Sequence, residues 1–295
     1  MIVTILQTDI EWGRPLDNIR QAEQLLAQAP ESDLYVLPEM WATGFATDPH
    51  GIAEPEATAP SLDWMRRTAR ARHCALCGSL AIEIPSPGSS GIPGTSGSSV
   101  SPGSSVPSGI SGTPGIPGSS AGSPSAPTYH NRHYFIDGRT PSEAHYDKHH
   151  LFSYGHEDRY YTPGQHHTIA RYMGFRLLLL TCYDLRFPLW SRYADDLQFD
   201  AIICVANWPD SRQNAFQILT RARAIENQAY LIACNRVGTD PYSHYRGASC
   251  ILSPIGRTLA ACPPNQPSTC TATLSLPDLQ HKRQKFRVLS ERDRR

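Results

Sequence analysis

The sequence has no excess of charge of either sign. Its 295 residues include 27 Lys and Arg and 27 Asp and Glu, so the formal net charge at pH 7 is zero. A nucleic-acid-binding domain usually carries a clear basic excess, and we therefore expect no nucleic-acid partner. The basic residues near the end, between Lys282 and Arg295, are interpreted as a solvated tail.

Long apolar runs are also absent. No uncharged apolar segment approaches the roughly 20 residues that a helix needs to cross a bilayer. The first residues, 1–9, have neither the basic nor the apolar region of a secretory leader. Cysteines are scattered, and Cys204, Cys234 and Cys250 lie in apolar segments, as expected of reduced thiols packed as small hydrophobic residues. We expect a cytoplasmic protein with no membrane partner.

Motifs for metals and cofactors are weak or missing. Cys74 and Cys77 form one Cys-x-x-Cys pair, but no second pair accompanies it, so packed thiols are the favoured interpretation. Neighbouring histidines at 149–150 and 166–167 would point to opposite faces of an extended segment, so each pair offers one ligand at most to a common site. No glycine-rich phosphate loop precedes a helix. We expect neither a metal nor a cofactor.

Apolar periodicity alternates along the chain between strand-like and helix-like segments. Strands are predicted at 2–7, 34–37, 75–84, 129–136, 144–147, 176–180, 201–206, 229–234, 248–253 and 257–261. Helices are predicted at 18–29, 62–73, 189–195 and 215–227. This alternation is typical of an α/β protein. Because the two halves look alike, we expect two sheets that face each other with helices outside.

A low-complexity segment interrupts this pattern at residues 86–127, which are almost entirely Ser, Gly and Pro without charge. Such a composition cannot bury enough apolar surface to offset its ordering entropy, so we expect a disordered surface loop. The flanking segments 81–84 and 129–136 are predicted to pair as neighbouring strands, with a turn at Asp137-Gly138. A linker between two domains is the alternative. It is disfavoured because residues on both sides of the segment are needed for one site.

Three reactive side chains follow predicted strands. Cys182 follows the run 177–181, Glu39 follows 34–38, and Lys148 follows 144–147. A thiol needs a base or a positive neighbour to act as a nucleophile at neutral pH. Glu39 could supply the base, and Lys148 could stabilise the oxyanion formed when sulfur attacks a carbonyl. Singly, each residue also has an ordinary structural explanation: a core thiol, a strand end and a solvated charge.

Together with their surroundings, these residues resemble the nitrilase (carbon–nitrogen hydrolase) superfamily. The motifs occur in the family's order: Pro38-Glu39, 146–152 (YDKHHLF), 182–188 (CYDLRFP), 221–228 (RARAIENQ) and 235–238 (NRVG). The resemblance implies a four-layer α-β-β-α sandwich built of two mixed sheets. It also implies a hydrolase domain over 1–275, interrupted by the segment 86–127, and a C-terminal extension over 276–295.

The family's Glu-Lys-Cys triad maps onto this chain residue by residue. The resemblance implies that Glu39 is the general base, Lys148 the oxyanion stabiliser and Cys182 the nucleophile. Glu157 matches a second glutamate of the family, which would orient Lys148 or position substrate; an exposed loop acid is its alternative interpretation. The backbone N–H of Tyr183 would be the second oxyanion donor.

Within the family, the chain is most similar to the omega-amidase branch. The segments that carry this similarity are 39–45, 148–155, 205–209 and 278–289. The branch hydrolyses the terminal carboxamide of small dicarboxylate monoamides such as 2-oxoglutaramate and 2-oxosuccinamate. Asn207 and Trp208 would line the pocket, and Arg186, Phe45 and Tyr154 are candidates for substrate contacts by position.

The expected function is therefore hydrolysis of such an amide through a cysteine thioester, with release of ammonia. Two alternatives stay open at this point. One is a family hydrolase of another C–N substrate, a nitrile or an N-carbamoyl amine. The other is a non-catalytic scaffold in which the segment 86–127 recruits a partner. By resemblance alone, a homodimer is expected.

Overall fold

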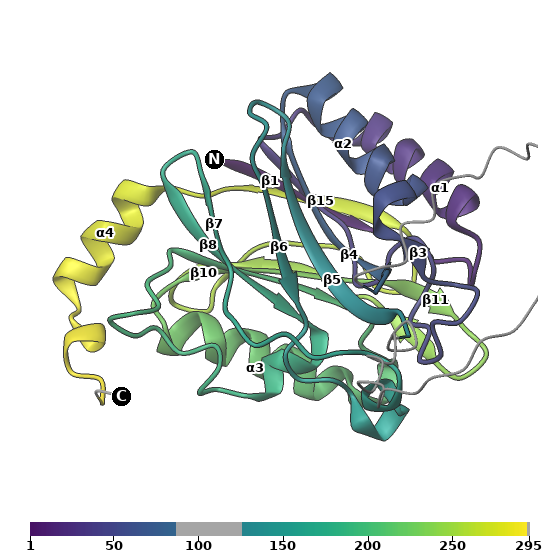
Figure 1. The fold of residues 1–295 in the computed structure, drawn as a ribbon. Coiled ribbons are helices and arrows are strands. Elements are labelled where there is room, and N and C mark those ends of the chain that lie inside the picture. The colour runs from purple at the N-terminus through teal and green to yellow at the C-terminus, as the bar shows by residue number, and fades with distance from the viewer. Residues whose placement is uncertain (87–125, 294–295) are drawn as a thin grey trace, which may run out of the picture.

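The computed structural model describes residues 1–86 and 126–293. Two β-sheets lie face to face, with α1 and α2 outside the first sheet and α3 outside the second (Figure 1). Apolar side chains of one buried cluster fill the space between the two sheets. Within the described residues, no helix has the length and apolar character needed to cross a membrane. The predicted four-layer α-β-β-α arrangement is confirmed.

The first sheet is mixed and has the strand order β15-β1-β2-β4-β5-β6, with β3 paired to β4. Its strands are β1 (Ile2–Gln7), β2 (Leu34–Val36), β3 (Glu54–Pro55), β4 (Ala75–Ile84), β5 (Thr128–Asp137), β6 (Glu143–Asp147) and β15 (Ser268–Thr273). The helices α1 (Pro15–Gln28) and α2 (Pro60–Arg72) cover its outer face. Both helices begin two or three residues before their predicted starts because proline is favoured in the first helical turn.

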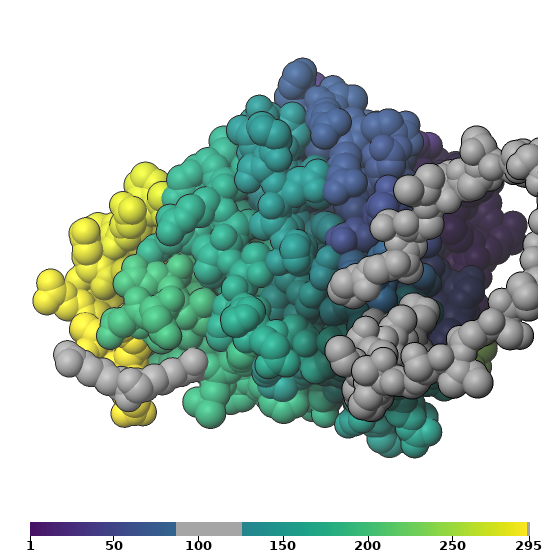
Figure 2. All heavy atoms as spheres, viewed as in Figure 1, coloured from purple at the N-terminus to yellow at the C-terminus, as the bar shows by residue number. Residues whose placement is uncertain are grey.

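The second sheet has the order β14-β13-β10-β9-β8-β7. Its strands are β7 (Ile169–Tyr172), β8 (Phe175–Thr181), β9 (Ala201–Ala206), β10 (Tyr230–Asn235), β13 (Cys250–Leu252) and β14 (Thr258–Ala261). Helix α3 (Gln213–Glu226) covers its outer face through residues such as Phe216. A separate hairpin joins β11 (Val237–Thr239) to β12 (His244–Arg246), and α4 (Leu276–Lys285) lies at one side of the molecule (Figures 1 and 2).

The largest apolar cluster lies between the two sheets and includes Val36, Cys77, Leu179 and Ile203, all fully buried. Strands β8, β9 and β10 are covered on both faces, by this cluster and by the one beneath α3. Strands buried on both faces read as continuous apolar runs, which explains why their positions were predicted correctly.

The predicted pairing across the low-complexity segment is confirmed. Strands β4 and β5 are antiparallel neighbours along their whole length, from Ala75 opposite Asp137 to Ile84 opposite Thr128. Of the segment itself, residues 87–125 lie outside the described residues, so its expected disorder stays a prediction. The division at residue 275 also stays a prediction.

The predicted helix at 189–195 is wrong. The chain forms turns and bends there. Its backbone groups are bound by a side chain instead of by a helical ladder: Tyr193 N donates to Asn227 Oδ1 at 2.8 Å, and Asn227 Nδ2 donates to Ser191 O at 2.9 Å. Side-chain amides offer the backbone an alternative to regular structure, and this one outweighs the weak apolar periodicity of the segment.

Candidate active site

The predicted triad residues lie just beyond strand ends on both sheets. Glu39 follows β2 and Lys148 follows β6 in the first sheet, whereas Cys182 follows β8 in the second. Glu39 and Lys148 have no solvent exposure, and Cys182 is partly exposed. The face-to-face packing of the sheets therefore brings the three side chains together.

Glu39, Lys148 and Glu157 form a buried ionic cluster. Lys148 Nζ donates to Glu39 Oε1 at 2.8 Å and to Glu157 Oε2 at 2.8 Å. Glu157 begins the short 3₁₀ helix η3 (Glu157–Arg159), and its Oε2 also accepts from the backbone N of Phe152 at 2.6 Å. Glu157 is fully buried, so the alternative interpretation as an exposed loop acid is wrong.

The electrostatics of this cluster follow from burial and charge. Burial alone would lower the pKa of Lys148, but the carboxylates of Glu157 and Glu39 outweigh it and hold this pKa well above its ordinary value. Burial raises the pKa of Glu157, with Lys148 opposing the shift. The single ammonium of Lys148 thus neutralises part of the charge of two carboxylates, and Lys148 holds its proton tightly.

Two asparagines orient the carboxylates. Asn131, in β5, donates from one nitrogen, Nδ2, to Glu39 Oε1 at 2.8 Å and to Glu157 Oε1 at 3.0 Å. Asn207, beyond β9, donates its backbone N to Glu39 Oε2 and its Nδ2 to Glu39 O, each at 2.8 Å. The sequence reading placed Asn207 at the pocket but missed Asn131. The available signal was weak: asparagine is disfavoured in strands, but a sequence does not show that the amide is buried.

Cys182 occupies a strained corner. Its φ is 47°, in the left-handed region that non-glycine residues seldom adopt, and it begins the 3₁₀ helix η4 (Cys182–Arg186). Burial raises the pKa of its thiol well above the ordinary value, the Glu39 carboxylate adds to the shift, and Lys148 opposes it. The carboxylate of Glu39 is thus near enough to the thiol to influence its pKa. The resting site therefore holds a protonated thiol beside a base.

Asp184 fixes this corner and was also missed. Its Oδ2 accepts from Thr181 N at 3.0 Å and from the hydroxyl of Tyr146 at 2.7 Å. Its Oδ1 accepts from the backbone N of His150 at 2.9 Å. The carboxylate thereby ties the turn that carries Cys182 to the segment that carries Lys148.

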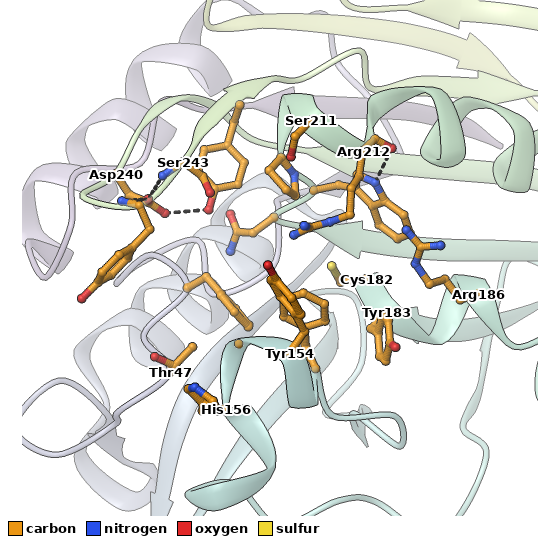
Figure 3. A pocket seen from close by; sticks show the side chains of 18 residues that line it. Thr47, Tyr154, His156, Cys182, Tyr183, Arg186, Ser211, Arg212, Asp240 and Ser243 are labelled. Carbon is orange, nitrogen blue, oxygen red and sulfur yellow. Dashed lines mark hydrogen bonds between the residues drawn. The ribbon is translucent and has the colours of Figure 1, made fainter.

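A cavity of about 600 Å³ opens in front of Cys182 (Figure 3). All six residues predicted to contact substrate line it: Phe45, Tyr154, Tyr183, Arg186, Asn207 and Trp208. Aromatic rings and an amide close to a thiol make a pocket suited to a small polar molecule with an apolar stem.

Two guanidinium groups on the cavity wall have no carboxylate partner. Neither Arg186 nor Arg212 makes a side-chain hydrogen bond or an ion pair with another residue in the parts of the chain that are described. Arg186 Cζ lies 4.9 Å from the centre of the Trp208 ring, and Arg212 Cζ lies 5.1 Å from that of Phe152. Because Lys148 is balanced by its own carboxylates, these two groups give the cavity a positive wall. Arg212 was not singled out from the sequence.

Across the cavity from the two arginines, the β11–β12 hairpin contributes Asp240, a carboxylate that already accepts three hydrogen bonds. Asp240 Oδ1 accepts from the backbone N of Tyr242 and of Ser243, each at 2.8 Å, and its Oδ2 accepts from the Tyr245 hydroxyl at 2.6 Å (Figure 3). Within residues 1–86 and 126–293, no group of three or more His, Cys, Asp and Glu side chains is arranged to hold a metal ion.

The arrangement is suited to acyl transfer. A thiol lies near a carboxylate that can take its proton, and the ammonium of Lys148 donates a hydrogen bond to that carboxylate. The cavity in front of the thiol can hold a carbonyl compound, and its positive wall favours an anionic one.

Comparison with known proteins agrees with this geometry. Residues 109–284 match the family model described as carbon-nitrogen hydrolase. An omega-amidase YafV of Yersinia enterocolitica is 33% identical over 99% of this chain and 96% of its own length. The YafV of Escherichia coli is 34% identical over the same shares. A 2-oxoglutaramate amidase of Bacillus subtilis is 29% identical over 88% of this chain and 85% of its own.

Solved structures have the same fold. A CN-hydrolase superfamily protein of Xanthomonas campestris, with an arsenic adduct in its active site, superposes with a TM-score of 0.80 at 28% identity, covering 99% of this chain and 97% of its own. A mutant amidase of Nesterenkonia sp., which carries acrylamide added at its active-site cysteine, has a TM-score of 0.71 at 20% identity, covering 97% and 98%. The second likeness concerns the fold alone.

Proposed function

The chain belongs to the carbon–nitrogen hydrolase family, in its omega-amidase branch, and hydrolyses non-peptide amides; we propose that its substrate is a small dicarboxylate monoamide and that Cys182 forms a thioester with it. The observation that carries this proposal is one cavity lined both by Cys182, behind which Glu39 and Lys148 are buried, and by two guanidinium groups that have no carboxylate partner among the described residues. The catalytic cluster supplies the chemistry, and the positively charged guanidinium groups match the free carboxylate of the substrate.

In the proposed acylation, Glu39 removes the thiol proton as the Cys182 sulfur attacks the amide carbonyl. The oxyanion is held by the ammonium of Lys148 and by the backbone N–H of Tyr183. The proton on Glu39 then passes to the leaving nitrogen, the C–N bond breaks, and ammonia departs. The raised thiol pKa fits this order, because the proton moves only as attack proceeds.

In the proposed deacylation, Glu39 takes a proton from a water molecule that attacks the thioester carbonyl. The C–S bond breaks, the proton returns to sulfur, and a dicarboxylic acid leaves. Glu157 acts by holding Lys148 in place through its bidentate contact, at 2.8 and 3.1 Å. Arg186, on the cavity wall beside Cys182, contacts the carboxylate at the far end of the substrate.

The names of the relatives support this choice of substrate. Proteins aligned over most of this chain are described as omega-amidase and 2-oxoglutaramate amidase. The test is ammonia release from 2-oxoglutaramate, 2-oxosuccinamate, glutamine and asparagine side by side, with a nitrile and an N-carbamoyl amine as comparisons. We expect the two 2-oxo acids to be the best substrates. A preference for the nitrile or the carbamoyl compound would refute the proposal.

The thioester is tested by Cys182→Ala. We expect ammonia release to be abolished while the midpoint of urea unfolding is unchanged, because the smaller side chain removes the nucleophile and few core contacts. Rapid labelling of one thiol by iodoacetamide in the parent protein, lost in the variant, would distinguish an enzyme from a scaffold. Undiminished turnover by the variant would exclude this mechanism.

Two further expectations belong with this proposal. All eight cysteines are free, which favours a reducing compartment such as the cytoplasm. A homodimer is expected from the family resemblance alone, and light scattering on the purified protein measures it directly.

A further inference from the structure

We propose that Arg212 is a specificity-determining residue: its guanidinium binds the free carboxylate of the substrate and disfavours substrates that carry an ammonium group beside it. This inference rests on the proposed amidase function and deepens it. Arg212 ends the 3₁₀ helix η5 (Asp210–Arg212), in the segment that leads from Asn207 to α3. It therefore comes from a different element than Arg186, which lies on η4 after the nucleophile.

The position of Arg212 is fixed from two sides. Its backbone O accepts from the indole N–H of Trp208 at 2.8 Å, and Cζ lies 5.1 Å from the Phe152 ring centre and 5.9 Å from that of Tyr154. Phe152 is itself held by Glu157 through its backbone N, at 2.6 Å. The aromatic platform beneath the guanidinium is thus attached to the catalytic cluster. A planar cation stacked in this way keeps its N–H edge free for a ligand.

Trp208 connects the two cations. Its indole N–H binds the Arg212 backbone, and its ring faces the Arg186 guanidinium at 4.9 Å. Cys182, Arg186 and Arg212 all line the same cavity (Figure 3). A carboxylate a few bonds beyond the scissile carbonyl is therefore within the field of both guanidinium groups, and it can accept hydrogen bonds from each.

The charge pattern favours a 2-oxo acid over an amino acid as substrate. A 2-oxo acid brings only negative charge to the positive wall, whereas glutamine or asparagine brings an ammonium group as well. Asp240, the acid across the cavity, already accepts three hydrogen bonds. Among the described lining residues it is the only carboxylate, so no unsatisfied acid faces that ammonium. Repulsion by Arg212 then favours the 2-oxo acid over the amino acid.

The test compares five-carbon amides that differ only at the far end. They are glutaramate with a carboxylate, 2-oxoglutaramate with a carboxylate and a keto group, glutamine with an added ammonium, and pentanamide with none of these. We expect Arg212→Met to lower kcat/KM for the first two about 10- to 100-fold, mainly through KM, because a charge-assisted contact is lost. Pentanamide should change less than about threefold. Glutamine should lose less than glutaramate, since a repulsion is removed as well.

Arg212→Lys should recover part of the lost kcat/KM, because the charge returns without the planar fork. The matched control is Arg257→Met, an exposed arginine in the β13–β14 turn outside the cavity, which should leave all four substrates unchanged. An equal loss for pentanamide and glutaramate would mean that Arg212 is merely structural. No change with any substrate would equally overturn the inference.

Binding separates this inference from the proposed function. Calorimetry of glutaramate with the Cys182→Ala protein requires no turnover, and adding Arg212→Met should weaken the Kd about 10- to 100-fold. If the parent protein released no ammonia from any of these amides, the proposed function would fail, while this titration would still decide the role of Arg212. An unchanged Kd would overturn that role whatever the activity.

Discussion

One amide nitrogen, Nδ2 of Asn131, holds both carboxylates of the catalytic cluster, at 2.8 Å from Glu39 Oε1 and 3.0 Å from Glu157 Oε1. The other end of the amide, Oδ1, accepts from Ser79 Oγ at 2.8 Å. The substitution Asn131→Asp keeps the shape of the side chain and replaces the donor nitrogen with an oxygen. Both carboxylates then lose a donor, and a third carboxylate joins them around a single ammonium.

The size of the effect follows from these contacts. A hydrogen bond to a charged group contributes roughly 1.5–3 kcal/mol, so losing two weakens the cluster by about 3–6 kcal/mol. If this loss falls on the transition state, kcat/KM decreases roughly 10²- to 10⁴-fold. Carboxylates in contact cannot all ionise, so the new group has a raised pKa in the folded protein. A group whose pKa is raised in the folded protein stabilises the fold at low pH, where it is protonated. Its contribution to the free energy of unfolding is lost as the pH rises through that pKa.

The assay is ammonia release across pH together with urea unfolding at pH 5 and pH 8. We expect the stability difference between Asn131→Asp and the parent to be larger at pH 8. Ser79→Ala is the control, because it leaves both Nδ2 contacts and removes the contact to Oδ1 together with the hydrogen bond from Met40 N to Ser79 Oγ. Its loss of kcat/KM should stay below about tenfold. An Asn131→Asp protein within threefold of the parent in kcat/KM, with a pH-independent stability difference, would refute the reasoning.

Two other predictions follow from the same cluster. The ultraviolet absorbance of a thiolate should be missing at pH 7 when the parent is compared with Cys182→Ser, because burial and Glu39 raise the thiol pKa; a thiolate signal already present at pH 7 would contradict this. Lys148→Met should lower the free energy of unfolding by about 3–5 kcal/mol, because two buried carboxylates lose their cation. That loss should be larger at pH 8 than at pH 5, since protonation relieves the repulsion at low pH; a loss independent of pH would count against the buried pair.

The sequence predicted ten of the described strands, and the reactive side chains that follow three of them, because each is marked locally; β3, β7, β11, β12 and β15 were missed. The start and end of an apolar run can be recognised in the sequence, and so can the polar residue that follows it, without knowledge of the fold. The partners of these residues carry no such mark. Asn131 lies 92 residues from Glu39, and its amide looks like any other polar group in a strand. In the sequence, Arg212 looks like an ordinary surface charge; only the structure shows that no carboxylate among the described residues is paired with it.

The contacts that cross between the sheets explain why the site needs the whole sandwich. Asn207, at the end of β9, binds both the carboxylate and the backbone O of Glu39 on the other sheet. A second bridge runs from β5 to β8. Burial lowers the pKa of His133 to about 3, so its ring is neutral with one proton. Its Nδ1 lies 3.2 Å from Leu180 O, which can only accept, so the proton is on Nδ1.

With Nδ1 as the donor, Nε2 of His133 is left as the acceptor for the thiol of Cys77, 2.8 Å away. This buried Cys–His pair therefore holds a fixed tautomer and acts as a structural tie, not as a second nucleophile and base. The contact of His133 with Leu180 O holds β8 in place two residues before Cys182. Asn207 in turn holds the base, Glu39, at the end of β9. Base and nucleophile are thus each anchored to the opposite sheet, so their separation is set by the packing of the core and not by the loops around the cavity.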